Sequence, residues 1–492
     1  MITAKYKGKY YDIEYSIVNV SKLEGELRLD AEYYDPYYLK IEEKIKSKNW
    51  LPIQNLLVEK PQYGSTPEGG VFEKSGIPFI RSQDLKDGFV EINQFCKKEF
   101  HEKNNKSKVI KGDILLAVIG ATIGEVAIYL QDEEANINQN IARLRFSNIN
   151  AYYTFSFMNT NYFKAQLYKF NTGNAQPYIN TFQILSFIIP IPSETFQKLI
   201  EKLVLKAYEE RQKAEDLYKQ AEETLLEELG LKNWKPKTKK IKIGGTEFEE
   251  EENISIRMLS DILKVDRMDA EYWEPRYDEI EKIIKNYKNG YSIISKEFLH
   301  KTTKLKINKN DYYNYIEISS VNVSNGDFLP SFLKGEDLPA NAKLKIGKND
   351  LIISKVRTYR KGIALINKSY PNLIGSSAFT VLHEKEDNRF NIETLFIFLR
   401  TNIFSLWSYK FYTGTSYPTL TDDDILNLPI PLIDNKTQQK IASLVQQSFK
   451  ARENSKKLLE ISKRAVEIYI EKDEVEGQKY INEHLQEMKV KI

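Results

Sequence analysis

Residues 28–36 read Arg-Leu-Asp-Ala-Glu-Tyr-Tyr-Asp-Pro, and residues 267–275, 239 positions later, read Arg-Met-Asp-Ala-Glu-Tyr-Trp-Glu-Pro. Chance does not supply a phrase of this length twice, so we interpret the chain as a tandem duplication. Further pairs of phrases follow in the same order: residues 111–116 with 347–353, residues 172–177 with 413–418, and Ile-Pro-Ile-Pro at 189–192 with Leu-Pro-Ile-Pro at 428–431. Each copy is therefore predicted to fold as one similar unit.

Within each copy, alternating apolar residues and β-branched content predict strands. The predicted strands are 77–81, 113–119, 126–130 and 141–146 in copy one, and 315–318, 350–354, 363–366 and 379–382 in copy two. Helical stretches follow at 151–168 and 392–409. The expected fold class is α+β, with two similar domains.

A long charged segment without interior Pro or Gly follows each prolyl pair and predicts two helices, 193–229 and 434–471. Their small and apolar residues alternate by four and three, the spacing of a coiled-coil seam. The seam residues are Phe196, Ile200, Leu203, Ala207, Ala214, Leu217 and Ala221, then Ile441, Leu444, Ala451, Leu458 and Ala465, with Ser448, Ser455 and Ser462 between them. We expect an antiparallel coiled coil; the alternative is that each helix packs only on its own domain.

These features divide the chain into six parts. The predicted boundaries are 1–192 for the first domain, 193–230 for the central helix, 231–252 for a charged linker, 253–433 for the second domain, 434–475 for the C-terminal helix and 476–492 for a tail. In the linker, a block of Lys adjoins a block of Glu, which favours a solvated hairpin over a binding arm.

Composition excludes several classes. The chain has 492 residues, 72 Lys plus Arg against 69 Asp plus Glu, and a net charge of +3, so any basic site must be local. A single cysteine, Cys96, and four scattered His offer no disulfide or zinc spacing, which indicates a reducing, cytoplasmic location. The longest aliphatic stretch, 114–119, is far too short to cross a membrane. We expect no membrane association.

Catalytic signatures are missing from the sequence. The sequence contains no GxxxxGK[ST] phosphate loop, and no GxGxxG motif follows a predicted strand. The acidic runs 249–252 and 422–424 are better explained as linker and as a first helical turn, and nothing positions them around a metal. A non-catalytic protein is expected, with a DNA-binding nuclease and a protein scaffold as the alternatives.

Loops rich in hydrogen-bonding side chains flank the predicted strands and are the candidate DNA-binding residues. In copy one they are Tyr63, Gly64, Ser65, Thr66, Arg81, Gln83, Thr122, Asn138, Gln139, Asn140, Asn174, Gln176 and Tyr178. In copy two the same sites are more basic: Lys301, Thr303, Lys304, Lys306, Lys355, Arg357, Tyr359, Arg360, Lys361, Thr415, Ser416 and Tyr417. Among these loops the most basic is 355–361, which replaces 118–124 of copy one and suits phosphates.

In this order and spacing, the phrases resemble the specificity subunits of Type I restriction–modification enzymes. The likeness rests on Tyr-Gly-Ser-Thr-Pro at 63–67, Gly-Ile-Pro-Phe-Ile-Arg at 76–81, Gly-Asp-Ile-Leu-Leu at 112–116, Gly-Ala-Thr-Ile-Gly at 120–124, Asn-Gln-Asn at 138–140, Gly-Asn-Ala-Gln-Pro at 173–177 and the prolyl pair before each helix. The family's usual Glu-Gln after the prolyl pair is altered here, and copy two lacks the Gly-Ser-Thr-Pro turn.

The resemblance implies two target-recognition domains that each read one half of a split, asymmetric site in double-stranded DNA, while the paired helices fix the spacing. It also implies two modification subunits, which would carry S-adenosylmethionine and methylate adenine, and a restriction or translocase subunit. No cofactor is expected in this chain. A related defence system, or a bifunctional cutting and methylating system, remains open as an alternative.

Overall fold

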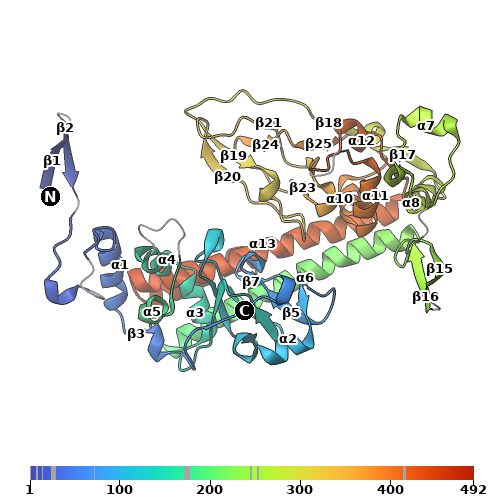
Figure 1. Ribbon diagram of the computed structural model, residues 1–492. Coiled ribbons are helices and arrows are strands. Elements are labelled where there is room, and N and C mark those ends of the chain that lie inside the picture. The colour runs from blue at the N-terminus through green and yellow to red at the C-terminus, as the bar shows by residue number, and fades with distance from the viewer. Residues whose placement is uncertain are drawn as a thin grey trace. The chain divides into compact units, whose positions relative to one another are not determined.

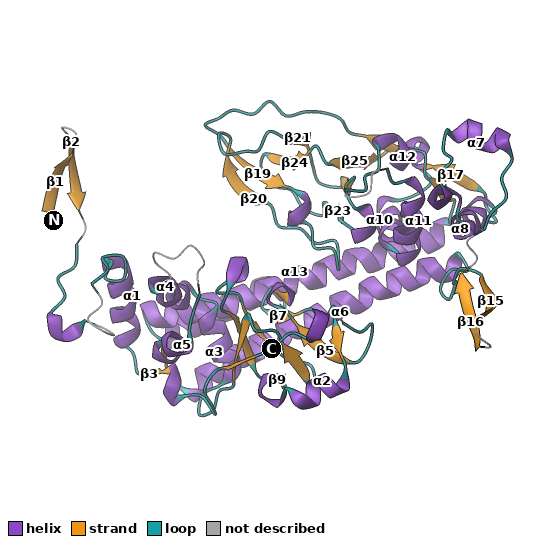
Figure 2. Ribbon diagram, in the orientation of Figure 1, coloured by secondary structure: helices purple, strands orange, loops and turns teal. Residues whose placement is uncertain are grey.

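The computed structural model describes residues 2–6, 9–13, 15–23, 29–70, 72–170, 178–243, 246–251, 254–413 and 417–492. They form two compact units, one of residues 1–211 with 452–492 and one of residues 212–451. Each copy combines sheets with helices, and two long helices complete the molecule (Figures 1 and 2). This arrangement confirms the predicted α+β fold class.

Unit 1 contains copy one. Its strands are β1 (Ile2–Tyr6), β2 (Lys9–Ile13), β3 (Trp50–Pro52), β4 (Gln62–Tyr63), β5 (Ile77–Ile80), β6 (Leu85–Lys86), β7 (Phe89–Val90), β8 (Phe95–Cys96), β9 (Lys108–Val109), β10 (Ile114–Ala117), β11 (Val126–Ile128), β12 (Ala135–Ile137), β13 (Ile141–Leu144) and β14 (Ile188–Pro190). Its helices are α1 (Pro36–Lys46), α2 (Lys98–Lys103), α3 (Ala151–Met158), α4 (Asn161–Lys169), α5 (Thr181–Ser186) and α14 (Glu474–Met488).

Unit 2 contains copy two. Its strands are β15 (Thr238–Ile243), β16 (Thr246–Glu251), β17 (Tyr291–Ile293), β18 (Phe298–His300), β19 (Tyr312–Ile316), β20 (Ser331–Lys334), β21 (Ala342–Lys345), β22 (Leu351–Ser354), β23 (Ile363–Leu365), β24 (Leu373–Ser376), β25 (Phe379–Glu384) and β26 (Pro429–Pro431). Its helices are α7 (Leu259–Val265), α8 (Pro275–Lys285), α9 (Ile294–Glu297), α10 (Ile392–Arg400), α11 (Asn402–Ser408) and α12 (Asp422–Leu426).

The sheets of the two units match strand for strand. Copy one has the orders β11-β10-β13-β4 and β8-β5-β12-β9, and copy two has β23-β22-β25-β18 and β20-β19-β24-β21. In both copies one pair is parallel, β5 with β12 and β19 with β24. Every predicted strand overlaps an observed one, and the duplication read from the sequence extends to the sheet topology.

The helical stretches predicted at 151–168 and 392–409 are confirmed, and each of them divides into two helices. The cause is a threonine at the same place in both copies: the Thr160 side chain accepts from the Phe163 N–H, and the Thr401 side chain accepts from the Phe404 N–H. Both threonines cap a new helix, and a capping residue leaves helical geometry.

The long helices α6 (Glu194–Glu228) and α13 (Asn435–Glu471) agree with the predicted ranges. In unit 1 the N-terminal part of α6 contacts the C-terminal part of α13, and the rings of Phe196 and Tyr469 lie 5.6 Å apart. In unit 2 the hydroxyl of Ser448 donates to the carbonyl oxygen of Ala214 at 2.6 Å. Within each unit the helices therefore pair antiparallel, and packing of each helix only on its own domain is wrong.

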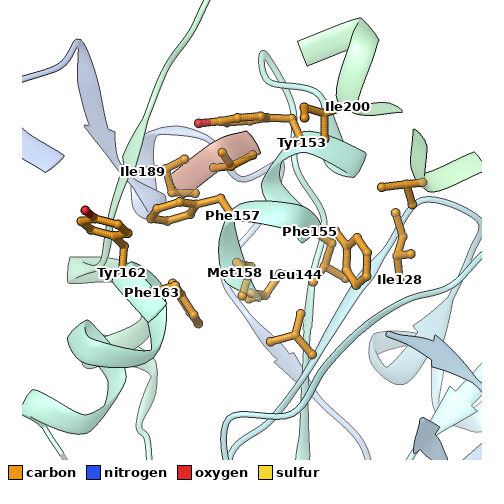
Figure 3. Packing of buried hydrophobic residues seen from close by; sticks show 14 of the residues in the cluster. Ile128, Leu144, Tyr153, Phe155, Phe157, Met158, Tyr162, Phe163, Ile189 and Ile200 are labelled. Atoms are coloured by element: carbon orange, nitrogen blue, oxygen red, sulfur yellow. The ribbon is translucent and has the colours of Figure 1, made fainter. Parts of the chain in front are cut away.

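Most predicted seam residues are buried, including Phe196, Ile200, Ile441 and Leu458, whereas Leu217 and Leu444 are only half-buried. In unit 1 the seam continues into the domain core, where Phe155 and Phe157 of α3 belong to the same apolar cluster as Ile200 of α6 (Figure 3). Unit 2 repeats this arrangement with Phe396 of α10 and Leu225 of α6. The cores thus fix each domain on the helix pair.

Two smaller elements follow from charge and capping. The linker forms the predicted hairpin, in which β15 and β16 pair residues 239, 240 and 242 with 250, 249 and 247, placing each Lys opposite a Glu in the register. The acidic run 422–424 opens α12, and the Thr421 hydroxyl accepts from the Asp424 N–H. Over the parts of the chain that the structure describes, none of the helices has the length and hydropathy required to cross a bilayer.

Candidate nucleic-acid interface

In copy one, the predicted turn at 63–66 lies directly on the loop at 138–140. Gly64 is pressed against the backbone, because a Cβ added there would lie 1.7 Å from the carbonyl oxygen of Ile137. The Thr66 hydroxyl donates to the side-chain oxygen of Gln139 at 2.7 Å. Only glycine permits this close approach. The two loops, separated by more than 70 residues in the sequence, are one surface.

Two more loops join the same surface. The Val118 N–H donates to the carbonyl oxygen of Asn140 at 2.9 Å, and the Ile179 N–H donates to the carbonyl oxygen of Val118 at 3.1 Å. The Tyr63 hydroxyl shares a hydrogen bond of 3.0 Å with the Thr181 hydroxyl, and burial raises the pKa of Tyr63. The segments 63–66, 118–124, 138–140 and 178–181 therefore gather where the central strands of copy one end.

Arg81 belongs to a neighbouring loop but is held inside it. Its guanidinium donates twice to the carboxylate of Asp84, at 3.0 and 3.1 Å, and Asp84 is buried. A fork engaged in this way is not presented as a free base reader, whereas Gln83 of the same loop is exposed. The structure therefore gives Arg81 a positioning contact, and Gln83 is the more exposed of the two side chains.

Copy two gathers its loops in the same way. The Arg357 N–H donates to the carbonyl oxygen of Pro418, and the Leu420 N–H donates to that of Lys355, both at 2.9 Å. The Lys355 ammonium group also donates to the carboxylate of Asp422 at 3.2 Å. The basic loop 355–361 thus occupies the place that 118–124 occupies in copy one.

The backbone of the basic loop carries strain. Arg357 and Lys361 have φ angles of +49° and +60°, and the matching positions in copy one, Gly120 and Gly124, have +83° and +85°. A residue with a Cβ pays about 1 kcal/mol or more in this left-handed region, whereas glycine does not. Copy two keeps the backbone shape of copy one but places cations where glycines would be free of strain, a pattern typical of functional sites.

Aromatic rings lie beside these cations. The ring of Tyr359 stacks on that of Tyr409 with centroids 4.9 Å apart, and the Tyr359 N–H donates to the Tyr412 hydroxyl at 2.7 Å. The Arg357 guanidinium lies 4.8 Å from the ring centre of Tyr417, which is largely exposed. Cations with exposed rings can contact both phosphates and bases.

Two further predicted cations are engaged within the fold. Lys301 donates to the buried carboxylate of Asp350 at 2.5 Å. Lys361 donates to the side-chain oxygen of Asn402 at 2.7 Å, and burial lowers the pKa of its ammonium group. These two lysines therefore contribute to the loop framework as well as to its charge.

The predicted residues occupy a range of depths. Exposed ones are Thr66, Gln83, Gln139, Tyr178, Thr303, Lys304, Lys306, Arg360 and Tyr417; half-buried ones are Tyr63, Gly64, Ser65, Arg81, Thr122, Asn140, Lys301, Lys355, Arg357, Tyr359 and Lys361; Asn138 is buried. Asn174, Gln176, Thr415 and Ser416 lie outside the described residues.

Sequence reasoning missed Arg400, a buried residue of α10 that holds the basic loop by hydrogen bonds. This buried guanidinium donates to the carbonyl oxygens of Lys361, Ile363 and Val323 at 2.7 to 2.9 Å and to the hydroxyl of Tyr218 in α6 at 2.9 Å. A charged residue ending the apolar run 395–399 was the available signal, because a buried charge requires partners. Arg400 links the loop to the long helix.

The duplicated Gly-Asp and Asn-Asp phrases also have a structural role. Buried Asp113 accepts two hydrogen bonds from Arg145, at 2.7 and 2.8 Å, and Asp350 accepts from His383 at 2.7 Å as well as from Lys301. Each buried carboxylate therefore has charged partners at the start of a central strand.

Comparison with known proteins gives a consistent picture. Residues 57–217 match a family model described as the Type I restriction modification DNA specificity domain. The chain is 41% identical over 73 residues to the EcoBI specificity subunit of Escherichia coli, covering 14% of this chain and 15% of that protein. It is 29% identical over 139 residues to the HindI specificity subunit of Haemophilus influenzae, covering 28% and 30%. The matches thus span less than a third of these relatives.

Among solved structures, the S subunit of a Type I restriction–modification system from M. genitalium aligns over 86% of this chain and 95% of its own. Its sequence identity is 14% and the TM-score is 0.37.

Proposed function

We propose that this chain, which resembles the specificity subunits of Type I restriction–modification enzymes in its sequence phrases and in the domain at residues 57–217, is the DNA-reading subunit of such an enzyme. Each copy would contact one half of a split site in double-stranded DNA through its gathered loops. Because the loops of the two copies differ in chemistry, the two half-sites would differ in sequence.

One observation carries this proposal: cations at Arg357 and Lys361 occupy left-handed positions that are glycines in copy one. Strain of this kind persists only where the surrounding structure maintains it, and it clusters at functional sites. Arginine beside exposed tyrosines is suited to phosphate oxygens and base edges, and residues 355–361 place four cations within seven positions.

The chain would act as a reader, and catalysis would belong to its partners. Two methyltransferase subunits would dock on it, bind S-adenosylmethionine and methylate adenine, and a restriction or translocase subunit would join them. Methylation requires the target base to leave the duplex and enter a pocket of the enzyme that modifies it.

Binding of labelled duplex DNA by the complex with its methyltransferase tests the basic loop. The double variant Arg357→Glu with Arg360→Glu is expected to weaken binding about 100-fold at moderate salt, since two attractive contacts become repulsive. Lys436→Glu, an exposed charge reversal at the start of α13, is the matched control and should leave affinity unchanged. Equal affinity of the double variant and the control contradicts the role of this loop.

Methylome sequencing of a host that carries the chain with its methyltransferase tests the reading of a split site. Methylated adenines should fall in two short, unlike sequences at a fixed separation. A continuous motif, or DNA cleavage by the chain alone with Mg²⁺, would count instead for a different reader or for a nuclease.

A further inference from the structure

The segment that leads into each copy exposes apolar side chains at corresponding positions. These apolar docking residues are Tyr15, Ile17, Val20 and Leu29 in copy one and Ile254, Ile256, Leu259 and Met268 in copy two, each pair 239 residues apart. They are 47, 85, 71 and 79% exposed in copy one and 68, 95, 66 and 82% exposed in copy two. Large apolar side chains grouped on a surface mark an interaction site, because burying each one stabilises a complex by about 1.5–3 kcal/mol.

The backbone of each segment is held in place by the same hydrogen bond. The Ser16 hydroxyl donates to the carbonyl oxygen of Tyr34 at 2.5 Å, and the Ser255 hydroxyl donates to that of Trp273 at 2.6 Å. Both neighbours of each serine are exposed, Tyr15 and Ile17 beside Ser16 and Ile254 and Ile256 beside Ser255. Their exposure is built into the fold.

The residues around these anchors repeat as well. The Lys169 ammonium group lies 4.3 Å from the ring centre of Tyr33 and donates to Glu42 at 2.8 Å. In unit 2 the Lys410 ammonium group lies 5.1 Å from the ring centre of Tyr272 and donates to Glu281 at 2.7 Å. Beside the latter set, a cleft of about 490 Å³ is lined in part by Val265, Tyr272 and Trp273. The same contacts thus support both segments, and in unit 2 a recess lies beside them.

The recognition loops and the apolar docking residues behave differently between the copies. Where copy one has Gly120 and the Gly-Ser-Thr-Pro turn, copy two has Arg357 and lysines, as surfaces that read different sequences require. The apolar positions keep their character in both copies, and so does an exposed acid, Glu32 and Glu271. The two apolar surfaces stay alike while the recognition loops beside them diverge. This is expected if each surface binds one copy of the same partner.

We infer that the apolar docking residues of the two copies are equivalent binding sites for two copies of one protein subunit, whose contact surface is apolar with a basic residue facing Glu32 or Glu271. This inference rests on the proposed function, which supplies the identity of that subunit: the adenine methyltransferase of the complex. Each copy of the chain would then hold one methyltransferase beside its own recognition loops.

The number of methyltransferase subunits bound to the full chain, measured by native mass spectrometry of co-expressed proteins, tests the inference. The variants are Ile17→Glu with Leu29→Glu in copy one, Ile256→Glu with Met268→Glu in copy two, and all four together. Because these side chains are exposed, folding should be preserved, and the thermal midpoint of each free variant verifies it. The controls are Val475→Glu and Leu329→Glu, equally exposed apolar residues elsewhere in units 1 and 2.

The wild-type chain and both controls should carry two methyltransferases, each two-site variant should carry one, and the fourfold variant should carry none. Each affected site should lose at least about tenfold in affinity. Two methyltransferases retained on the fourfold variant would overturn the inference and leave the proposed function intact. A wild-type chain that binds no methyltransferase would overturn both. Self-association of the free chain that the fourfold variant abolishes would assign the surface to a second copy of this chain, and thus also overturn the inference.

Discussion

Arg357 shows how a single residue can be placed against its own backbone preference. The left-handed turn at this position is inherited from a framework that in copy one uses Gly120. The charge of Arg357 is expected to affect DNA affinity, and its backbone strain is expected to affect stability, so the two effects can be tested separately.

Arg357→Gly should separate these two quantities. Glycine removes about 1 kcal/mol of strain but adds a similar freedom to the unfolded chain, so the thermal midpoint should shift by no more than about 2 °C. DNA affinity of the complex should fall about tenfold, because one cationic contact is lost. Calorimetry and a binding titration measure the two effects. A large drop in stability with unchanged affinity would make Arg357 a structural residue.

Glu222 of α6 makes a prediction that depends on pH. Burial raises the pKa of this carboxyl above its usual value, against the lowering influence of Lys361 and Arg400. A carboxyl group whose pKa rises on folding destabilises the folded state once it is ionised. This destabilisation disappears as the pH falls below the pKa of the group in the unfolded chain. Glu222→Gln should therefore raise the thermal midpoint at pH 7, and the gain should vanish near pH 4, about the ordinary pKa of Glu. An equal gain at both pH values would indicate a packing effect.

Single residues were partly predictable from the sequence. The basic loop and the Gly64 turn stood out because their residue types are chemically distinctive. The engagement of Arg81 by Asp84, and of the loop by Arg400, could not be predicted, because both depend on which side chains are buried together in three dimensions.

Among the elements, α14 depends on the absence of a side chain. A Cβ at Gly477 would lie 2.9 Å from the ring of Phe196 in α6 and 3.1 Å from the carbonyl oxygen of Ala465 in α13. Glycine in a helix is ordinarily unfavourable by about 1 kcal/mol relative to alanine. The close approach of three helices reverses that preference.

Gly477→Ala should therefore destabilise unit 1, although alanine favours a helix. Overpacking costs about 1–3 kcal/mol, so the thermal midpoint should fall by a few degrees, whereas Glu483→Ala on the exposed face of α14 should have little effect. Adding Phe196→Ala makes room for the new methyl group. If Gly477→Ala is as harmful in that background as in the wild type, the contact with Phe196 is not the cause.

The elements with strong periodicity were predicted best. The long helices agree with their expected ranges, since 3.6-residue spacing without Pro or Gly is unambiguous. The breaks at Thr160 and Thr401 within the predicted helical stretches could not be predicted, because threonine occurs both inside helices and at their caps. Helix α14 lies where a tail was expected, since its buried face requires a partner that the local sequence does not reveal.

For the whole molecule, both long helices begin in one unit of the chain and end in the other. We propose that their length sets the separation of the two half-sites. The duplication itself was the most reliable sequence signal, because it depends on order over hundreds of residues rather than on local propensity.

Insertion of one heptad into both helices, after Arg211 and after Ala451, tests this proposal. Seven residues add about 10.5 Å of helix, equivalent to about 3 base pairs, and preserve the seam. The methylated motif of the host should keep both half-sites and gain about three positions between them. An unchanged separation would show that the helices do not set it.

The shared left-handed turn also bears on how new sequence preferences arise. Because the same backbone path accommodates either glycines or cations, this loop can change its chemistry by point substitution without any rearrangement of the strands around it. Descendants of one ancestral module could thus diversify their targets while the scaffold stayed constant. A chain with two modules inherits two such independent positions. The number of combined DNA targets available to a lineage is therefore the product of the choices at each position.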